Sequence, residues 1–426
     1  MEKALLVTIE IKSEKNNWPL EDIACELEEL VHTCRVEAVD NITCICGRPT
    51  PNLLIGSGKA RELALLAEEL KANVLIFSHD LSGTQQRNLE DVLGRKTVDR
   101  TQLILDIFAK HAKSLEGKMQ VELAQLEYLL PRLTGKGIVL SRQGGGIGTS
   151  GPGETKLEVD RRRIRKRIDK LKDELSGLTL HRQTMRKKRK ENALPTAVLV
   201  GYTNAGKSTL LNALTNAGQV VSDGLFTTLD PLYKSLQLPN GENIIISDTV
   251  GFLHNLPHHL IEAFKATLEE VAEADLLIHV LDITHPRIYE HHQAVVEVLK
   301  QLNAGEKPVI TLLNKIDLLQ ERGLIDRLKK DFPAAVAVSA RLKENFKRLF
   351  EEVEKNFSAR MMDIEVMIPH SRMDLVDLFY REGKVKKIDY LQEGIKISLS
   401  LPKIIQHKLL RGKDIKILPN PIQKLS

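Results

Sequence analysis

Residues 201–208 read Gly201-Tyr202-Thr203-Asn204-Ala205-Gly206-Lys207-Ser208, which is the GxxxxGK[ST] pattern of a phosphate-binding loop. The stretch before it, residues 197–200, is apolar and β-branched, whereas residues 207–214 are typical of a helix that Thr209 helps to open. The two glycines let backbone N–H groups converge on an anion, and the helix N-terminus adds its positive dipole end. A strand, this loop and a helix in this order predict a nucleotide phosphate site.

Four further motifs complete the order that a guanine-nucleotide site requires. Three of them follow the apolar runs 244–246, 309–313 and 335–338, so we expect them at strand ends. Each motif alone fits an ordinary polar turn, but five motifs in this order do not. The four are Phe226-Thr227-Thr228-Leu229-Asp230, Asp248-Thr249-Val250-Gly251, Asn314-Lys315-Ile316-Asp317 and Ser339-Ala340-Arg341.

Each motif is expected to make a defined contact with bound GTP or GDP. Lys207 reaches the β and γ phosphates, and the N–H of Gly251 senses the γ phosphate. Ser208, Thr228 and Asp248 share a Mg²⁺ ion, with Thr228 joining when the γ phosphate is present. At the base, Asp317 accepts two hydrogen bonds from the guanine edge, Lys315 lies over the ring, and the backbone near Ser339 donates to guanine O6. Lys207, Thr228 and Gly251 are therefore the predicted catalytic residues.

One residue expected in a Ras-like enzyme is missing. A glutamine normally follows the Asp-x-x-Gly motif and orients the attacking water, but Phe252 stands there. A phenyl ring cannot hydrogen-bond water, so we expect slow intrinsic hydrolysis that a partner stimulates. His254, His258 and His259 follow; Pro257 breaks the helical spacing that zinc ligands would need, and a water-orienting role for His258 stays open.

Composition points to a soluble multidomain protein of the cytoplasm. With 426 residues the chain is too long for a single hydrophobic core. Its composition, 42% hydrophobic and 28% charged, is typical of soluble globular proteins. Its N-terminus lacks a signal-peptide profile, and no apolar run approaches the roughly 18 residues of a membrane span. Four cysteines, Cys25, Cys34, Cys44 and Cys46, form neither a zinc spacing nor a disulfide framework, so we expect reduced thiols.

The pattern predicts an α/β multidomain fold with four parts. Residues 1–112 form a small α/β domain, 113–191 a helical hairpin, 192–357 a P-loop domain with a Ras-like doubly wound sheet, and 358–426 a small α+β domain. The first part should contain strands at 4–11, 36–46 and 74–77, and helices at 19–34, after 56 through 70, at 82–93 and at 101–112. The last part should contain strands at 364–368, 384–390 and 394–401, and helices at 371–382 and 402–410.

The hairpin is predicted from two apolar seams. Met119, Leu123, Leu126 and Leu130 form one, and Ile164, Ile168, Leu171, Leu175 and Leu178 the other, both with coiled-coil spacing. A short connection favours antiparallel packing. Within it, residues 135–153 are glycine-rich, with Lys136 and Arg142 as the strong charges; they are either a flexible linker or a loop that approaches RNA backbone closely.

Positive charge is concentrated in the second helix. Residues 156–191 carry fifteen Lys or Arg against six Asp or Glu, an excess larger than the net +5 of the whole chain. Such a segment suggests a polyanion, with nucleic acid as the leading candidate, although charged faces on coiled coils are often merely solvated. The acid-free clusters are Arg161-Arg162-Arg163, Arg165-Lys166-Arg167 and residues 186–190.

On these motifs the chain resembles the HflX family of translational GTPases. This family belongs to the class that includes Obg and has a hydrophobic residue in place of the catalytic glutamine. The resemblance rests on residues 151–158 (Gly-Pro-Gly-Glu-Thr-Lys-Leu-Glu), Asp160-Arg161-Arg162, the loop 201–208, residues 226–231 and Asp248 to Phe252 with Leu256-Pro257-His258. It implies a large-ribosomal-subunit partner bound through rRNA, and a role in splitting or rescuing stalled ribosomes. By resemblance to GTPases of the broader class, Asn204 would help to hold K⁺ near the phosphates.

Two other functions remain open at this point. One is a GTP-regulated scaffold for large-subunit assembly, and the other is a GTPase whose basic helix binds weakly to anionic membrane surfaces. We expect a monomer in each case.

Overall fold

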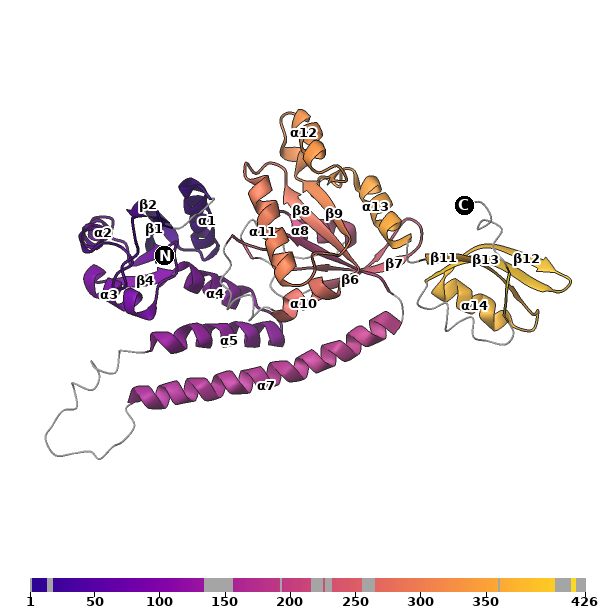
Figure 1. The fold of residues 1–426 in the computed structure, drawn as a ribbon, viewed down its shortest axis with the longest axis horizontal. Helices are drawn as coiled ribbons and strands as arrows, with labels where there is room; N and C mark the ends of the chain where they lie inside the picture. The colour runs from indigo at the N-terminus through magenta and orange to yellow at the C-terminus, as the bar shows by residue number, and fades with distance from the viewer. Residues whose placement is uncertain are drawn as a thin grey trace. The chain divides into compact units, whose positions relative to one another are not determined.

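The structure is a computed structural model that describes residues 2–13, 18–133, 156–191, 194–215, 225–226, 232–254, 265–358, 361–402 and 415–418. Its strands form three sheets (Figure 1). The chain divides into two compact units. Unit 1 comprises Met1–Thr179, Val221–Asp230 and Asn255–Leu268; unit 2 comprises Leu180–Val220, Pro231–His254 and Glu269–Ser426.

Unit 1 begins with a parallel four-stranded sheet in the order β2-β1-β3-β4. The central strands are the most apolar, and every residue of β3 is buried, as expected where helices cover both faces of a parallel sheet. The α/β domain predicted from the sequence is confirmed. Its elements are β1 (Lys3–Ile11), α1 (Leu20–Thr33), β2 (Glu37–Cys46), α2 (Ser57–Glu69), β3 (Val74–Phe77), α3 (Gly83–Leu93), β4 (Lys96–Asp99) and α4 (Arg100–His111).

Strand β4 was not predicted. It has four residues, and only Val98 among them is apolar, so no period-2 pattern marks it. The strand forms because it pairs in register with all four residues of β3. Its last residue, Asp99, also caps α4 by accepting the N–H of Gln102 at 2.8 Å.

Two long helices follow, α5 (Leu115–Arg132) and α7 (Lys156–Glu191), and they lie side by side in unit 1 up to Thr179 (Figure 1). The two predicted seams meet: Leu123, Ile168 and Leu171 are buried in one cluster flanked by Met119, Leu126, Leu130, Ile164 and Leu175. The glycine-rich connection lies outside the described residues.

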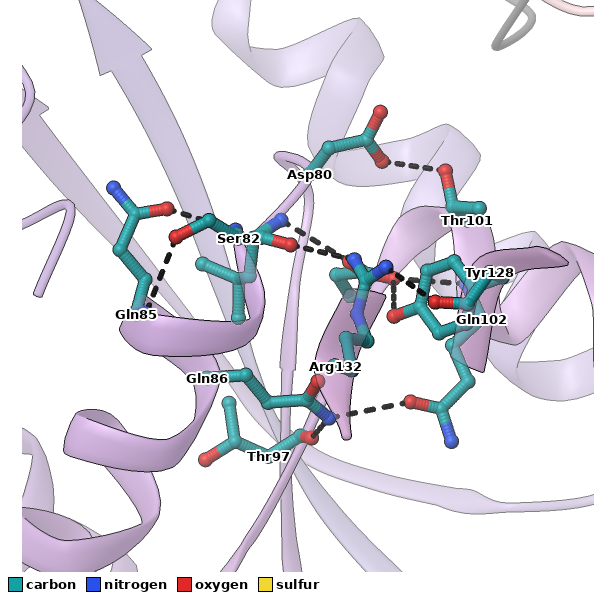
Figure 2. A network of polar contacts seen from close by, with 11 residues as sticks. Asp80, Ser82, Gln85, Gln86, Thr97, Thr101, Gln102, Tyr128 and Arg132 are labelled. Carbon is teal, nitrogen blue, oxygen red and sulfur yellow. Dashed lines mark hydrogen bonds and ion pairs between the residues drawn. The ribbon is translucent and has the colours of Figure 1, made fainter. Parts of the chain in front are cut away.

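A buried polar network fastens α5 to the first sheet (Figure 2). The Asp99 carboxylate accepts hydrogen bonds from the Tyr128 hydroxyl at 2.8 Å, from the Leu81 N–H at 3.1 Å and from Arg132 at 3.0 Å. The Arg132 guanidinium also lies 3.3 Å above the centre of the Tyr128 ring and donates to the Leu81 carbonyl. The Asp99 carboxylate is 1% exposed. The Arg132 cation and the donors of Tyr128, Leu81 and Gln102 replace the water that it loses on burial.

Unit 2 contains a six-stranded sheet in the order β10-β9-β8-β5-β7-β6, in which only β6 runs antiparallel to its neighbour. The described pairs β5–β7, β5–β8, β8–β9 and β9–β10 are parallel, so their carboxyl ends share one edge. The elements are β5 (Thr196–Gly201), α8 (Lys207–Thr215), β6 (Leu232–Gln237), β7 (Asn243–Asp248), α10 (Lys265–Glu273, which spans the boundary between the units), β8 (Leu276–Asp282), α11 (Ile288–Gln301), β9 (Val309–Asn314), η2 (Ile316–Leu318), α12 (Gly323–Asp331), β10 (Val336–Ala337) and α13 (Phe346–Ser358).

The last part of unit 2 is an antiparallel sheet, β12-β13-β11-β14, with α14 packed on it. Phe379 of α14 is fully buried against Ile395 and Ile397 of the sheet. This confirms the predicted α+β domain, although the expected helix at 402–410 lies almost wholly outside the described residues. The elements are β11 (Met361–Ile368), α14 (Met373–Glu382), β12 (Lys384–Leu391), β13 (Gly394–Pro402) and β14 (Lys416–Leu418).

Candidate functional site

The phosphate loop connects β5 to α8 at the carboxyl edge of the sheet. Gly201 has φ +157° and Gly206 has φ +93°. A Cβ at Gly201 would collide with the carbonyl oxygen of Val280, and one at Gly206 with the side-chain amide of Asn314. Asn204 has φ +59°, a left-handed conformation that asparagine tolerates. The loop can therefore take this curl only with glycine at both ends.

The Lys207 side chain turns back toward the first residues of the phosphate loop. Its ammonium donates hydrogen bonds to the carbonyls of Gly201 at 3.0 Å and Tyr202 at 2.7 Å. Burial lowers the pKa of Lys207 to about 8, and the Asp248 carboxylate opposes that shift. A phosphate group beside this ammonium would stabilise its charged form, so the residue is suited to anion binding.

Two candidate metal ligands meet where α8 begins and β7 ends. The Ser208 hydroxyl at the start of α8 donates to the Asp248 carboxylate at 2.6 Å, and Asp248 is fully buried at the end of β7. The other Asp248 oxygen accepts the Thr249 N–H. The Thr249 hydroxyl in turn donates to the Leu199 carbonyl of β5. A hydroxyl and a carboxylate are oxygen donors of the kind that Mg²⁺ prefers.

The segment after β7 continues along the phosphate loop. Phe252 donates its N–H to the Gly201 carbonyl at 3.2 Å, and the Thr203 N–H donates to the Phe252 carbonyl at 2.9 Å. A Cβ on Gly251 would lie 2.7 Å from a Thr203 methyl and 3.1 Å from the Lys207 ammonium nitrogen. Glycine is thus required where the backbone passes the lysine. The Phe252 ring is 1% exposed and faces the core rather than solvent.

Asn314 connects the phosphate loop to the base-binding motifs. Its side-chain amide donates to the Ala205 carbonyl at 2.9 Å, and its oxygen accepts the Ala340 N–H at 3.0 Å. This bridging role was not foreseen from the sequence, which suggested only that Asn314 belongs to the base pocket. The signal was present, because asparagine at a strand end offers both a donor and an acceptor.

Asp317 and Ser339 also lie together. The Ser339 hydroxyl donates to the Asp317 carboxylate at 2.6 Å and accepts the Leu342 N–H at 3.0 Å. Lys315, at φ +69°, forms a 2.7 Å ion pair with Asp282 at the end of β8. Sequence reasoning missed Asp282, because it belongs to no motif and reaches Lys315 only through the adjacent strands β8 and β9.

Only Phe226 of the Phe226 motif is among the described residues, and it packs within unit 1 together with Leu225, which precedes the motif. The Leu225 N–H donates to the Thr33 hydroxyl at 3.0 Å, and the Phe226 ring lies edge-on to Phe108 with centroids 4.6 Å apart. Phe226 is buried at φ +57°. Thr227, Thr228, Leu229 and Asp230 lie outside the described residues, as do His258 and His259.

The doubly wound sheet and this loop geometry define a P-loop GTPase. Over 408 residues, covering 96% of this chain and 93% of the relative, the sequence is 46% identical to the GTPase HflX of Caldanaerobacter subterraneus subsp. tengcongensis. The chain belongs to the HflX family of GTPases, and it is a GTP hydrolase.

Further sequence relatives, family models and a solved structure are similar to the chain. The chain is 40% identical to GTPase HflX of Escherichia coli K12 over 94% of its own length and 93% of the relative's. Three family models match consecutive segments: GTP-binding GTPase N-terminal at residues 21–109, GTP-binding GTPase Middle Region at 111–189 and 50S ribosome-binding GTPase at 196–315. A GTP-binding protein of Sulfolobus solfataricus, solved in complex with GDP, is 25% identical with a TM-score of 0.44, covering 84% of this chain and 99% of that one.

None of the helices in the described ranges is both long and apolar enough to span a membrane.

Proposed function

We propose that this GTPase associates with the large ribosomal subunit in a nucleotide-dependent way and splits or rescues stalled ribosomes. The match of residues 196–315 to a 50S ribosome-binding GTPase model supports the partner. The basic α7, matched by the family's middle-region model, supports contact with rRNA.

The convergence of Lys207, Ser208, Asp248 and Gly251 at the phosphate loop is the observation that carries the nucleotide site on which this function depends. In this proposal Ser208, Asp248 and Thr228 hold Mg²⁺, which neutralises phosphate charge when bound. The 2.6 Å hydrogen bond between Ser208 and Asp248 supports the fit of the first two. Lys207 binds the phosphates, and the Gly251 N–H holds the γ phosphate. Asp317, oriented by Ser339, recognises the guanine edge.

Intrinsic hydrolysis is expected to be slow, because no described side chain after Gly251 replaces the glutamine. Phe252 is buried and cannot orient water. The ribosome then supplies the water-positioning group. GTP turnover measured with and without 50S subunits should therefore rise on their addition.

We also propose that K⁺ assists hydrolysis from a position beside Asn204. This residue lies on the phosphate loop and has a left-handed backbone conformation. A monovalent cation there would offset charge that develops between the β and γ phosphates. Hydrolysis should then be faster in potassium than in sodium at equal ionic strength. Equal rates in the two salts would remove potassium from the proposal.

Cosedimentation with separated ribosomal subunits tests the partner. With a non-hydrolysable GTP analogue the protein should pellet with 50S subunits, and with GDP it should remain in the supernatant. Adding the analogue complex to 70S ribosomes should increase free 50S and 30S particles. Binding to precursor particles but not to mature subunits would instead indicate an assembly scaffold, and flotation with anionic liposomes would indicate a membrane role.

A further inference from the structure

Three rings lie together beside the phosphate loop, the Tyr202 and His291 rings stacked and the His285 ring tilted by 33° against His291. The Tyr202 ring lies 3.8 Å from the His291 imidazole, with 4° between their planes, and His291 lies 4.1 Å from His285. Tyr202 is the second residue of the loop, His291 belongs to α11, and His285 lies in the turn before that helix. Tyr202 and His291 are both buried, so the stack fixes the phenol ring against α11.

The Tyr202 hydroxyl points at the segment that carries Gly251. It accepts the backbone N–H of His254 at 2.8 Å. The backbone of the same segment is joined to the loop through Phe252, which pairs with Tyr202 in a parallel bridge. Backbone hydrogen bonds therefore hold Phe252 to the phosphate loop, and the Tyr202 hydroxyl holds the backbone of His254. Both contacts lie just after Gly251, which passes close to Lys207.

We propose that Tyr202 is a positioning residue for GTP hydrolysis: its ring is fixed by His291, and its hydroxyl holds the Gly251–His254 segment against the phosphate loop. The inference rests on the proposed role of Gly251 at the γ phosphate. The Tyr202 side chain touches no phosphate in this assignment. It acts through the backbone that follows Gly251.

The buried imidazole suits this role. Burial lowers the pKa of His291 to about 3; His285 and His254 add to the shift, whereas Asp282 opposes it. His291 is therefore neutral at physiological pH, and its face packs against the phenol without a charge to solvate.

The test is Tyr202→Phe in the full chain, with GTP and no ribosome. This variant keeps the stacked ring and removes the hydroxyl. A neutral hydrogen bond contributes enough to change a rate about three- to tenfold, so hydrolysis at saturating GTP should fall by about that factor. KM and GDP affinity should change less than about twofold, because Lys207 and the loop N–H groups are retained. Hydrogen exchange at the His254 amide should accelerate, whereas the amides of α8 should keep their protection.

A matched control lies on α11. Tyr289→Phe also removes a hydroxyl hydrogen bond, to Asp331 at 2.5 Å, but on an exposed side chain outside the site. Its rate should equal that of the wild type. His291→Leu should reproduce the Tyr202→Phe defect, because the phenol then loses its planar support.

Gly251→Ala separates the inference from the proposed site. Its Cβ would press on Thr203, so hydrolysis should fall sharply. If Gly251→Ala is slow and Tyr202→Phe is normal, the positioning role is refuted and the site stands. If Gly251→Ala hydrolyses GTP normally, the assigned γ-phosphate contact is wrong and the inference falls with it. A Tyr202→Phe variant that loses GDP affinity in proportion to rate would show a general loop defect and refute the positioning role as well.

Discussion

At the scale of single residues, base selection should depend on Asp317. Its carboxylate is oriented by the Ser339 hydroxyl at 2.6 Å, so its remaining acceptor capacity can face a base edge. Asp317→Asn exchanges an acceptor for a donor, which leaves polar groups of guanine unpaired and suits xanthine. We expect GTP affinity to fall at least tenfold and xanthosine triphosphate to bind, measured with fluorescent nucleotide analogues.

Asp326→Asn, an exposed acid on α12, is the matched control. Unaltered GTP affinity in Asp317→Asn would show that the base pocket has been assigned to the wrong residue.

His279 predicts how stability responds to acid. It is buried in β8, its Nε2 atom has no hydrogen-bond partner in the described part of the chain, and burial, with His292 beside it, lowers its pKa to about 3. The unfolded chain, with an ordinary pKa of about 6.5, therefore binds a proton below that pH while the folded chain does not. Stability is lost as pH falls from 6.5 toward 3.

His279→Leu removes this penalty. Between pH 7 and pH 5 the variant should lose about 2 kcal/mol less unfolding free energy than the wild type, as measured by urea unfolding with circular dichroism. His370→Gln, which removes an exposed imidazole of the C-terminal domain, is the matched control. Parallel losses in His279→Leu and the wild type would mean that this imidazole does not set the acid limit.

The phosphate-loop residues Gly201, Gly206, Lys207 and Ser208 could be predicted from the sequence because they lie within one short motif, whose spacing sets the curl of the backbone. The Tyr202–His254 bond and the Asp282–Lys315 pair join separate strands and loops. They exist because parallel strands bring these positions to one edge, which no short pattern records.

At the scale of elements, Asp99 at the end of the four-residue strand β4 joins that strand to α5 through hydrogen bonds with Tyr128 and Arg132. The sequence pattern found helices α1 to α5 and α7 but missed β4, since a strand that depends on pairing with β3 needs no apolar alternation of its own. The network of Asp99, Tyr128 and Arg132 joins residues up to 33 positions apart and lies outside any local signal.

Removing the Tyr128 hydroxyl should loosen this junction. Tyr128→Phe deprives a buried carboxylate of one donor and should cost about 1–3 kcal/mol. Arg132→Leu should cost more, about 3–5 kcal/mol, because it leaves the carboxylate without its cation. Trp18 is the sole tryptophan of the chain, so its fluorescence during urea unfolding reports on this domain.

Tyr390→Phe, at an exposed tyrosine of β12, is the control and should unfold as the wild type does. If Tyr128→Phe unfolds at the wild-type urea concentration, the network adds specificity of packing but no net stability.

At the scale of the whole molecule, positive charge is gathered on α7, but its members are not equivalent. Arg167 forms a two-bond ion pair with Glu122 of α5, each bond 2.7 Å, so it serves the helix pair. Arg162, Arg163, Arg165 and Lys166 are exposed. These four form the cluster that we expect to contact rRNA phosphates.

Each phosphate contact releases condensed counterions, so affinity for the 50S subunit should fall steeply with salt. Changing the four exposed cations to Gln keeps helix propensity and leaves charge as the main variable. The slope of log affinity against log salt should become shallower by about 3.6 units, if each of the four cations contacts one phosphate and the duplex value of about 0.9 per phosphate holds for structured RNA.

The matched control removes the same charge elsewhere. Arg327, Lys330, Lys347 and Arg348 are exposed on α12 and α13, and changing all four to Gln alters the net charge equally. Nonspecific attraction would flatten the slope alike in both variants, whereas a docking surface on α7 affects only the first. GTP affinity should be unchanged in the α7 variant, because these residues precede the nucleotide domain. An unchanged slope in that variant would make the α7 cluster a solvated face, and rRNA contact would then have to be tested at the glycine-rich residues 144–153.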